Sequence, residues 1–265
     1  MSEKMPFLVP SYAALAPIYN QAGLAQYATD HLPYYVSYAQ SMDWAGRRIL
    51  DLGCGTGVTS WWLAQQGYYT VGIDNSPYML QQARASIQER DEVSFEPPDF
   101  VEMDIRQLES PIGPVDMVVT AGCVLNAIQS LRELEATFTR IKQALDPGRL
   151  FIFDMRTIRG LADEIGECDR VLYDNNENLM VIGRNSFSYE TLSSTQNFLV
   201  WRRQNGLWQR QDEQHIERGY PTQGVIAILE RAGFRVMAVL NPDMSPFDVQ
   251  HDYSGHVVFV AQKPE

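Results

Sequence analysis

The chain has 265 residues, of which 45% are hydrophobic and 20% are charged, and its formal net charge at pH 7 is -12. This composition is that of a soluble globular protein and excludes a disordered or membrane-embedded chain, while the length allows one large α/β domain or a domain with an insertion. The negative charge disfavours nucleic acids and acidic membranes as partners, because it repels phosphate groups.

The cysteines and the first residues indicate the cellular setting. Cys54, Cys123 and Cys168 are far apart and form no Cys-x-x-Cys pair, so they suggest neither disulfides nor a zinc site. The histidines and carboxylates show no metal-like spacing either, and we expect no metal. Because the segment Met1 to Pro6 is not followed by an unbroken apolar stretch, we infer no targeting signal and a cytoplasmic location.

The chain begins with a segment rich in aromatic residues and alanine. Pro17 and Pro33 divide residues 11–44 into short pieces of helical character. We interpret residues 1–46 as an N-terminal helical cap.

From Arg47 onward, apolar runs of four to six residues alternate with stretches of helical periodicity. This alternation is typical of a parallel sheet with crossover helices. Ser76 followed by Pro77 predicts a helix start, and Asp146-Pro147-Gly148 predicts the end of an amphipathic helix. The pattern predicts an α/β fold with a doubly wound, mostly parallel, seven-stranded sheet. Its strands are expected at 47–52, 69–73, 100–103, 115–120, 149–154, 234–240 and 256–261.

The periodicity changes to two between residues 167 and 219. The turns Asp174-Asn175-Asn176 and Asn205-Gly206 favour antiparallel hairpins there. The sequence therefore predicts an antiparallel β insertion, while residues 47–166 and 220–265 form the main domain.

A glycine-rich loop, Gly53-Cys54-Gly55-Thr56-Gly57, follows the first predicted strand, and Asp51 precedes it. Glycines at this point let the backbone approach a ligand closely. The Gly-x-Gly-x-Gly spacing differs from the Gly-x-Gly-x-x-Gly loop that binds a dinucleotide pyrophosphate. Asp74 ends the second strand and can accept hydrogen bonds from both ribose hydroxyls of either kind of cofactor. The loop taken alone leaves an NAD(P)-dependent oxidoreductase open.

Several motifs in order resemble the class I S-adenosylmethionine-dependent methyltransferase domain: the loop, Asp74, Asp104, the strand Val115 to Gly122 and the turn before Arg149. The resemblance covers residues 47–155 and implies a Rossmann-like methyltransferase fold. It also implies S-adenosylmethionine as cofactor and S-adenosylhomocysteine as product. The residues that it implies for the cofactor are Asp51, Gly53, Cys54, Gly55, Asp74, Asn75, Met79, Asp104, Ile105, Thr120 and Ala121. Among them, Asp51 belongs to the motif that holds the methionine moiety and suits its ammonium, and Asp104 meets the adenine amino group.

The acceptor side carries a looser resemblance. The segment Tyr12 to Asn20 resembles the tyrosine-bearing first helix of small-molecule N-methyltransferases that act on amino sugars or glycine. Tyrosines of that helix close over the cofactor, so the resemblance implies Tyr12 and Tyr19 as a lid that contacts the cofactor. Residues 213–221 resemble a strand of the same branch. This resemblance implies methyl transfer to an amine nitrogen of an amino sugar or small metabolite, with the β insertion forming part of the acceptor site. Ligands of open α/β sheets bind beyond the carboxyl ends of the strands. The acceptor is therefore expected to meet Cys123, Asn126, Arg156 and Thr157.

The chemistry needs few groups from the protein. A sulfonium methyl group is transferred by in-line displacement, so positioning and exclusion of water dominate. A hydroxyl acceptor of high pKa needs a general base, for which His215 and Asp154 are the candidates. We interpret Asp116 as structural. An O-methyltransferase of a small hydroxylated metabolite, an oxidoreductase and a non-catalytic cofactor-binding protein stay open as alternatives, as does a homodimer.

Overall fold

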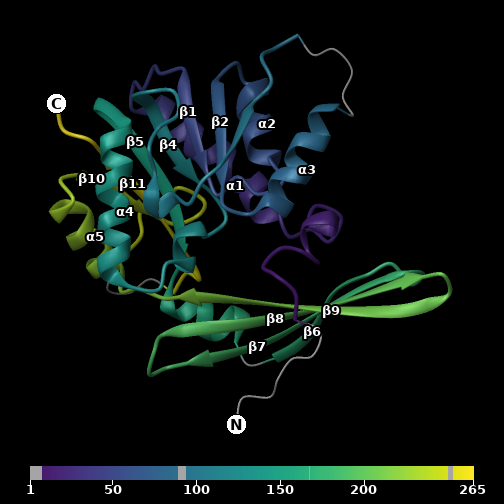
Figure 1. Cartoon of the computed structure of the whole chain (residues 1–265). Helices are drawn as coiled ribbons and strands as arrows, with labels where there is room; N and C mark the ends of the chain where they lie inside the picture. Colours follow the sequence, from purple (N-terminus) through teal and green to yellow (C-terminus); the bar gives the residue numbers. More distant parts are fainter. Residues whose placement is uncertain (1–7, 89–93, 167, 250–252) are drawn as a thin grey trace.

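The computed structural model describes residues 8–88, 94–166, 168–249 and 253–265. The interpretation of Met1 to Pro6 lies outside the described residues. Two separate sheets, one of seven strands and one of four, form the framework of the fold (Figure 1).

The larger sheet has the order β10-β11-β5-β4-β1-β2-β3. Strands β1 to β5 run parallel, whereas β11 is antiparallel to both of its neighbours. The predicted fold class is confirmed. Strand β5 begins four residues before the predicted start because its pairing with β4 is irregular, with Val115 opposite Leu145 and Met117 opposite Leu150. The strands are β1 (Arg48–Leu52), β2 (Tyr69–Asp74), β3 (Asp99–Glu102), β4 (Val115–Thr120), β5 (Leu145–Arg156), β10 (Arg235–Leu240) and β11 (His256–Gln262).

Helices cover both faces of this sheet. One core cluster holds α4 (Leu131–Ala144) and α5 (Thr222–Arg231) against the strands, and another holds α1 (Gln26–Ser41) and α2 (Val58–Gln65). Helix α3 (Pro77–Gln88) starts at the predicted serine cap, since the Met79 N–H donates to Ser76 Oγ at 3.3 Å. The short helices are η1 (Ala16–Ile18), η2 (Ile105–Gln107), η3 (Val124–Ala127) and η4 (Gly160–Ile165).

Helix α1 runs unbroken through Pro33, so the predicted division at this proline is wrong. Its side chains Leu32, Tyr35, Val36 and Ala39 are buried against the sheet. An interior proline costs about 3 kcal/mol, and burying each large apolar side chain returns about 1.5–3 kcal/mol. The packing therefore outweighs the proline, and α1 belongs to the helical layer of the main sheet.

Residues 8–25, named the cap below, pack differently from α1. Ala14, Leu15 and Ile18 form a small core with Leu179 and Val200 of the second sheet. In Figure 1 this purple segment lies between the glycine-loop end of the main sheet and the second sheet. The segment that contacts the second sheet is thus shorter than the predicted helical cap of residues 1–46.

The second sheet is antiparallel, with the order β6-β7-β8-β9. Its strands are β6 (Cys168–Asp174), β7 (Leu179–Ser188), β8 (Ser193–Gln204) and β9 (Leu207–Arg218). Both predicted turns are observed: Asn205 and Gly206 have positive φ angles of 51° and 80°, as a two-residue hairpin turn requires.

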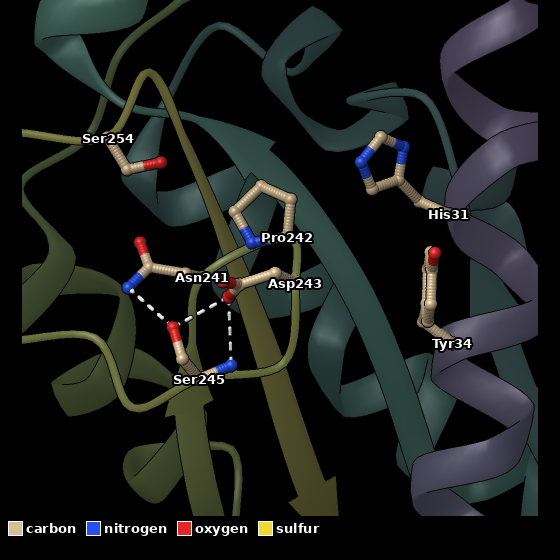
Figure 2. A pocket seen from close by; sticks show the side chains of 7 residues that line it. All are labelled: His31, Tyr34, Asn241, Pro242, Asp243, Ser245 and Ser254. Atoms are coloured by element: carbon tan, nitrogen blue, oxygen red, sulfur yellow. Dashed lines mark hydrogen bonds between the residues drawn. The ribbon is translucent and has the colours of Figure 1, made fainter.

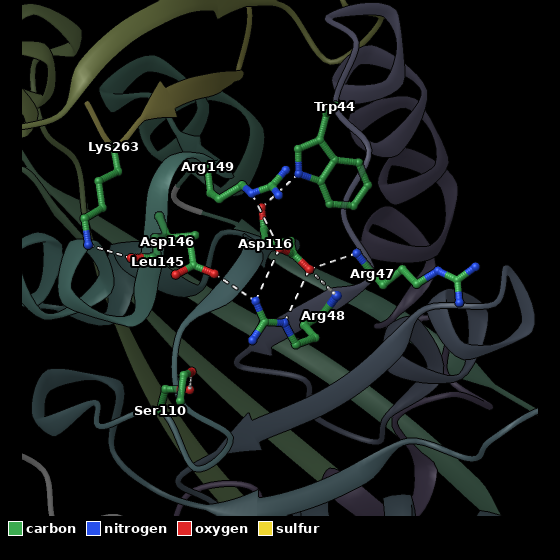
Figure 3. Close-up of polar contacts among 10 residues, drawn as sticks. Trp44, Arg47, Arg48, Ser110, Asp116, Leu145, Asp146, Arg149 and Lys263 are labelled. Carbon is green, nitrogen blue, oxygen red and sulfur yellow. Dashed lines mark hydrogen bonds and ion pairs between the residues drawn. The ribbon is translucent and has the colours of Figure 1, made fainter. Parts of the chain in front are cut away.

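Asp116 holds strands together at the amino-terminal edge of the main sheet (Figure 3). Its Oδ2 accepts hydrogen bonds from the backbone N–H groups of Arg47 and Arg48, both at 2.9 Å. Its Oδ1 lies 3.5 Å from Arg48 and from Arg149. Burial tends to raise the pKa of Asp116, but the N–H donors and the Arg48 guanidinium outweigh it and lower the pKa. The geometry agrees with the structural interpretation of this residue.

Replacing Asp116 by alanine is expected to lower the free energy of unfolding by about 2–3 kcal/mol, because two N–H groups lose a charged partner. Since the folded-state pKa is lowered, the stabilisation is present above about pH 4 and is lost as pH falls through the folded pKa. Urea unfolding of both proteins at pH 7 and near pH 3 measures this. Asp163→Ala, at an exposed ion pair, is the control. Equal stabilities of Asp116→Ala and wild type at pH 7 would contradict the assignment.

Candidate active site

The glycine loop joins β1 to α2 and leaves one glycine open to a ligand. Gly53, Gly55 and Gly57 have φ angles of 70°, 55° and 79°. A Cβ at Gly53 would lie 2.5 Å from Val124, and one at Gly57 would lie 2.5 Å from Phe100. A Cβ at Gly55 would meet, among the described residues, only Met79 Sδ at 4.0 Å. Gly53 and Gly57 are therefore required by packing, whereas the Gly55 backbone faces open space.

Asp74 holds this open loop at the end of β2. Its Oδ2 accepts a hydrogen bond from the Gly55 N–H at 2.9 Å, and its Oδ1 accepts one from the Ser76 N–H at 2.8 Å. Burial raises the pKa of Asp74, and the backbone donors limit the increase. Met79 is buried beside the loop and Asn75 is exposed. The structure thus brings three residues predicted for the cofactor, Gly55, Asp74 and Met79, close together.

Asp51 lies beneath the loop. It is 1% exposed, and its Oδ2 accepts hydrogen bonds from Thr59 Oγ1 at 2.7 Å and Ser60 Oγ at 2.6 Å. Burial raises the pKa of Asp51 to about 6. The carboxylate therefore binds the first turn of α2, and its contact with a ligand ammonium stays a prediction. Cys54 is also buried, so the loop offers its backbone rather than this thiol.

Asp104 follows β3 and is engaged by a neighbouring cation. Its Oδ1 accepts the Arg106 N–H at 2.9 Å, and its Oδ2 lies 2.6 Å from Arg106 Nη2. The hydrogen bonds from Arg106 lower the pKa of Asp104. The predicted contact with an adenine amino group would have to share this carboxylate with Arg106. Ile105 is half-buried beside it.

The end of β4 forms the floor between the loop and the acceptor side. Thr120 is fully buried, and its Oγ1 has no hydrogen-bond partner in the described part of the chain; Ala121 beside it is buried as well. Cys123 follows with a φ angle of 63°. This left-handed conformation aims the Gly122 and Cys123 amides at Asp154.

Asp154, predicted as a general base, is fully buried beneath that turn. Its Oδ1 accepts the Gly122 N–H at 2.9 Å, and its Oδ2 accepts the Cys123 N–H at 2.9 Å and the Cys123 thiol at 3.0 Å. Burial raises the pKa of Asp154. Both oxygens are occupied by the turn, so the geometry makes Asp154 a residue that positions the turn and does not support a role as base.

Two residues predicted to meet the acceptor have their side chains engaged elsewhere. The Asn126 amide donates to the carbonyls of Arg156 and Arg218 and accepts the Arg156 N–H, at 3.1, 2.8 and 2.9 Å. Thr157 Oγ1 donates to the Ser254 carbonyl at 2.9 Å and accepts the Gly160 N–H at 3.0 Å. The Asn126 bonds join η3, β5 and β9, and the Thr157 bonds fix the chain after β5. The structure therefore gives neither side chain a free group for an acceptor.

Glu213, on β9, is fully buried and holds the cap. Its Oε1 accepts the Tyr12 N–H at 2.5 Å, and its Oε2 accepts the N–H groups of Ala14 and Leu15 at 2.5 and 2.7 Å. Sequence reasoning missed this residue. The available signal is the alternation of Glu213, His215 and Glu217, which places three titratable side chains on one face of a strand.

His215 extends the same contact. Its Nε2 lies 3.1 Å from Glu213 Oε1, and its ring centroid lies 4.5 Å from that of Tyr12. The side chain is 14% exposed. A histidine held by a buried carboxylate has a fixed orientation, which suits an acid–base group.

Tyr12 and Tyr19 occupy the space between the glycine loop and β9. Burial, followed by the charges of Glu217 and Asp74, raises the pKa of Tyr19 to about 12. The Tyr19 hydroxyl therefore interacts with Asp74 beside the glycine loop and with Glu217 on β9. Thr56 of the glycine loop donates to Asn20 of the cap at 2.7 Å. The cap thus bridges the two sheets, as the prediction of a tyrosine lid requires.

Arg156 ends β5 beside Glu217 of β9. Its Nε lies 3.1 Å from Glu217 Oε2. Beyond Arg156, Tyr27 stacks on His256 and on His31, with ring centroids 4.4 and 4.1 Å apart. Burial, followed by the charges of Arg156 and His31, lowers the pKa of His256 to about 4.

His31 of this stack also lines a pocket of about 660 Å³ (Figure 2). None of the residues predicted for the cofactor or the acceptor lines it. Its lining residues are His31, Tyr34, Asn241, Pro242, Asp243, Ser245 and Ser254.

Within residues 8–88, 94–166, 168–249 and 253–265, no group of three or more His, Cys, Asp or Glu side chains is arranged to hold a metal ion. None of the helices there combines the length and the apolar character needed to cross a bilayer.

Comparisons with known proteins agree with this geometry. A family model described as a methyltransferase domain matches residues 49–148. A putative methyltransferase of Geobacillus sp. (strain WCH70) is 30% identical over 219 residues, which cover 82% of this chain and 85% of that protein. One of Bacillus subtilis (strain 168) is 28% identical over 233 residues, covering 86% and 88%.

Solved structures share the fold. An S-adenosylmethionine-dependent methyltransferase from Clostridium acetobutylicum ATCC 824 has a TM-score of 0.79 at 20% identity, covering 96% of this chain and 99% of that one. The sheet order and the open glycine loop define a Rossmann-like α/β fold. With the relatives above, they show that this chain belongs to the class I S-adenosylmethionine-dependent methyltransferases. The oxidoreductase alternative is set aside.

S-adenosylmethionine is the cofactor of this family and supplies an activated methyl group. The residues present fit such a group: Gly55 leaves open space above the loop, and the buried Asp74 lies beside it. The individual contacts remain our predictions.

Replacing Asp74 by alanine is expected to weaken S-adenosylhomocysteine binding by about 1.5–3 kcal/mol, the scale of hydrogen bonds to a charged group. Titration calorimetry measures the change. Asp99→Ala is the matched control, because Asp99 is exposed and lies at the start of β3, whereas Asp74 pairs with the end of that strand. It is expected to bind S-adenosylhomocysteine as tightly as wild type does. Unchanged affinity in Asp74→Ala would remove Asp74 from the site.

Replacing Glu213 by glutamine is expected to weaken S-adenosylhomocysteine binding by about 1–2 kcal/mol, because neutral hydrogen bonds hold the cap less firmly than charged ones. Gln211→Ala, exposed on the same strand, is the control. If Glu213→Gln bound the product as tightly as wild type, the cap would have no part in cofactor binding.

Proposed function

We propose that the protein transfers the methyl group of S-adenosylmethionine to an amine nitrogen of a small molecule, such as an amino sugar or a small amine metabolite. The observation that carries this proposal is the Glu213–His215 pair on β9, across the tyrosines Tyr12 and Tyr19 from the glycine loop. Buried carboxylates attract an ammonium acceptor, and a histidine can take its proton before transfer.

Similar folds support this acceptor class. A sugar N-methyltransferase from Streptoalloteichus sp ATCC 53650 has a TM-score of 0.74 at 16% identity, covering 93% of this chain and 92% of that one. An amino pentose methyltransferase from Micromonospora echinaspora has a TM-score of 0.68 at 15% identity, covering 93% and 96%. At these identities the likeness supports the proposal only through the shared fold.

In the proposed reaction, His215 accepts the proton of the acceptor ammonium and Glu213 stabilises the imidazolium that forms. The cap excludes water from the cleft, since its tyrosines cover the space beside Asp74. Gly53, Gly55, Asp74 and Met79 hold the cofactor.

A hydroxyl acceptor is the second candidate, because the same Glu213–His215 pair provides the base that oxygen methylation needs. Either acceptor is small in the proposal, since a net charge of -12 disfavours nucleic acids. A cytoplasmic setting is part of the proposal and is supported by the free thiols of Cys54 and Cys123.

The test is incubation with methyl-labelled S-adenosylmethionine and a panel of amines, amino sugars and hydroxylated metabolites. We expect the label on nitrogen, identified by mass spectrometry of the product. Label on oxygen alone would refute the amine acceptor, and absence of transfer across the panel would refute the proposed function.

The variant His215→Asn separates the two acceptors. For an amine, we expect kcat at pH 7 to fall about 100-fold and to recover toward wild type near pH 9, because the amine then loses its proton to solvent. For a hydroxyl the loss persists at pH 9. His31→Asn, outside the cleft, is the control. Full activity of His215→Asn at pH 7 would rule out His215 as the base.

A further inference from the structure

Four buried polar atoms lie together without hydrogen-bond partners in the described part of the chain. They are Ser194 Oγ and Gln196 Nε2 on β8, Glu217 Oε2 on β9 and Arg156 Nε on β5. Ser194 is 0% exposed and Gln196 is 9% exposed. Buried polar groups are almost always paired, so a cluster of unpaired ones requires an explanation.

The strand register shows that three of these atoms share one face. Ser194 lies opposite Glu217 and Gln196 lies opposite His215. Side chains of directly opposed residues point to the same side of a sheet. Arg156 joins them, because its Nε lies 3.1 Å from Glu217 Oε2 as an ion pair without hydrogen-bond geometry. Ser194, Gln196, Glu217 and Arg156 are named the polar face below.

The polar face borders the site of methyl transfer. His215 lies opposite Gln196 and two residues before Glu217, on the same face of the sheet, and it contacts Tyr12 of the cap. The charge of Glu217 raises the pKa of Tyr19, and so does the charge of Asp74 beside the glycine loop. A ligand on the polar face therefore lies across the tyrosines from the cofactor loop.

A neighbouring buried group on the same strand has its hydrogen bonds made. Glu213, two residues before His215, has three backbone donors. The residues that line the pocket of Figure 2 include none of the unpaired buried atoms of the described residues. Other such atoms lie elsewhere, as at Tyr35 and Thr120, but on the polar face four of them lie together.

We propose that the polar face recognises the methyl acceptor, with Ser194 and Gln196 as residues that determine its specificity. The proposal rests on the proposed function and narrows its substrate class. The Gln196 Nε2 donor fits an oxygen atom on the ligand, and the Glu217 carboxylate, which already pairs with Arg156, fits an N–H group. The acceptor that fits is a compact amine with a hydroxyl or carbonyl oxygen near the nitrogen.

The kinetic test compares Gln196→Ala and Ser194→Ala with wild type, using an amine that wild type methylates. We expect KM for the acceptor to rise about tenfold or more in each variant, the effect of losing one buried hydrogen bond, with S-adenosylhomocysteine affinity unchanged. Gln214→Ala is the matched control, because Gln214 is exposed and bonds to Asn197 on the opposite face of the strands. An acceptor KM that stays at the wild-type value in both test variants would overturn the proposal.

A stability test needs no acceptor. In the free protein, Ser194→Ala removes a buried hydroxyl that has no partner, so we expect Tm to rise by about 2–4 °C. A fall in Tm would show that the protein itself satisfies this hydroxyl, and it would overturn the proposal.

The two proposals fail separately. If wild type methylates no amine, the proposed function fails, and the stability test still decides whether the polar face lacks partners. If wild type methylates only a hydroxylated compound, the same KM comparison is made with that compound. If wild type methylates an amine and both polar-face variants keep its KM, only the recognition proposal fails.

Discussion

The buried carboxylate of Glu213 is the group that ties the cap to β9. It accepts hydrogen bonds from three backbone N–H groups of the cap and also contacts His215. A buried carboxylate without such partners would be strongly destabilising, so the cap and the strand stabilise each other. Because the cap also bonds to the glycine loop through Asn20 and Thr56, this contact joins the second sheet to the cofactor side of the main sheet.

Buried carboxylates hold backbone amides at two other turns around the site. Asp74 binds the amide of Gly55, and Asp154 binds the amides of Gly122 and Cys123. In each case a buried carboxylate fixes a turn whose residues have positive φ angles. Preorganised loops of this kind suit a reaction in which positioning supplies most of the rate, since the sulfonium is already activated.

Much of this architecture follows from local sequence patterns. The seven strands, the Ser76 cap and the Asn205-Gly206 turn each follow from propensity and periodicity within a few residues. The unbroken helix through Pro33 does not, because its stability comes from tertiary packing. The site divides in the same way. Gly55 and Asp74 are visible as a motif, whereas the roles of Glu213 and Asn126 come from partners far along the chain, which spacing alone does not specify.

Hydrogen exchange at the cap amides tests the central claim most directly, namely that buried Glu213 holds the cap over the cofactor loop. In wild type, the Tyr12, Ala14 and Leu15 amides are expected to exchange at least about 100-fold more slowly than in an unstructured peptide, and more slowly still with S-adenosylhomocysteine bound. Exchange of these three amides at the unstructured rate, with or without the product, would contradict the account.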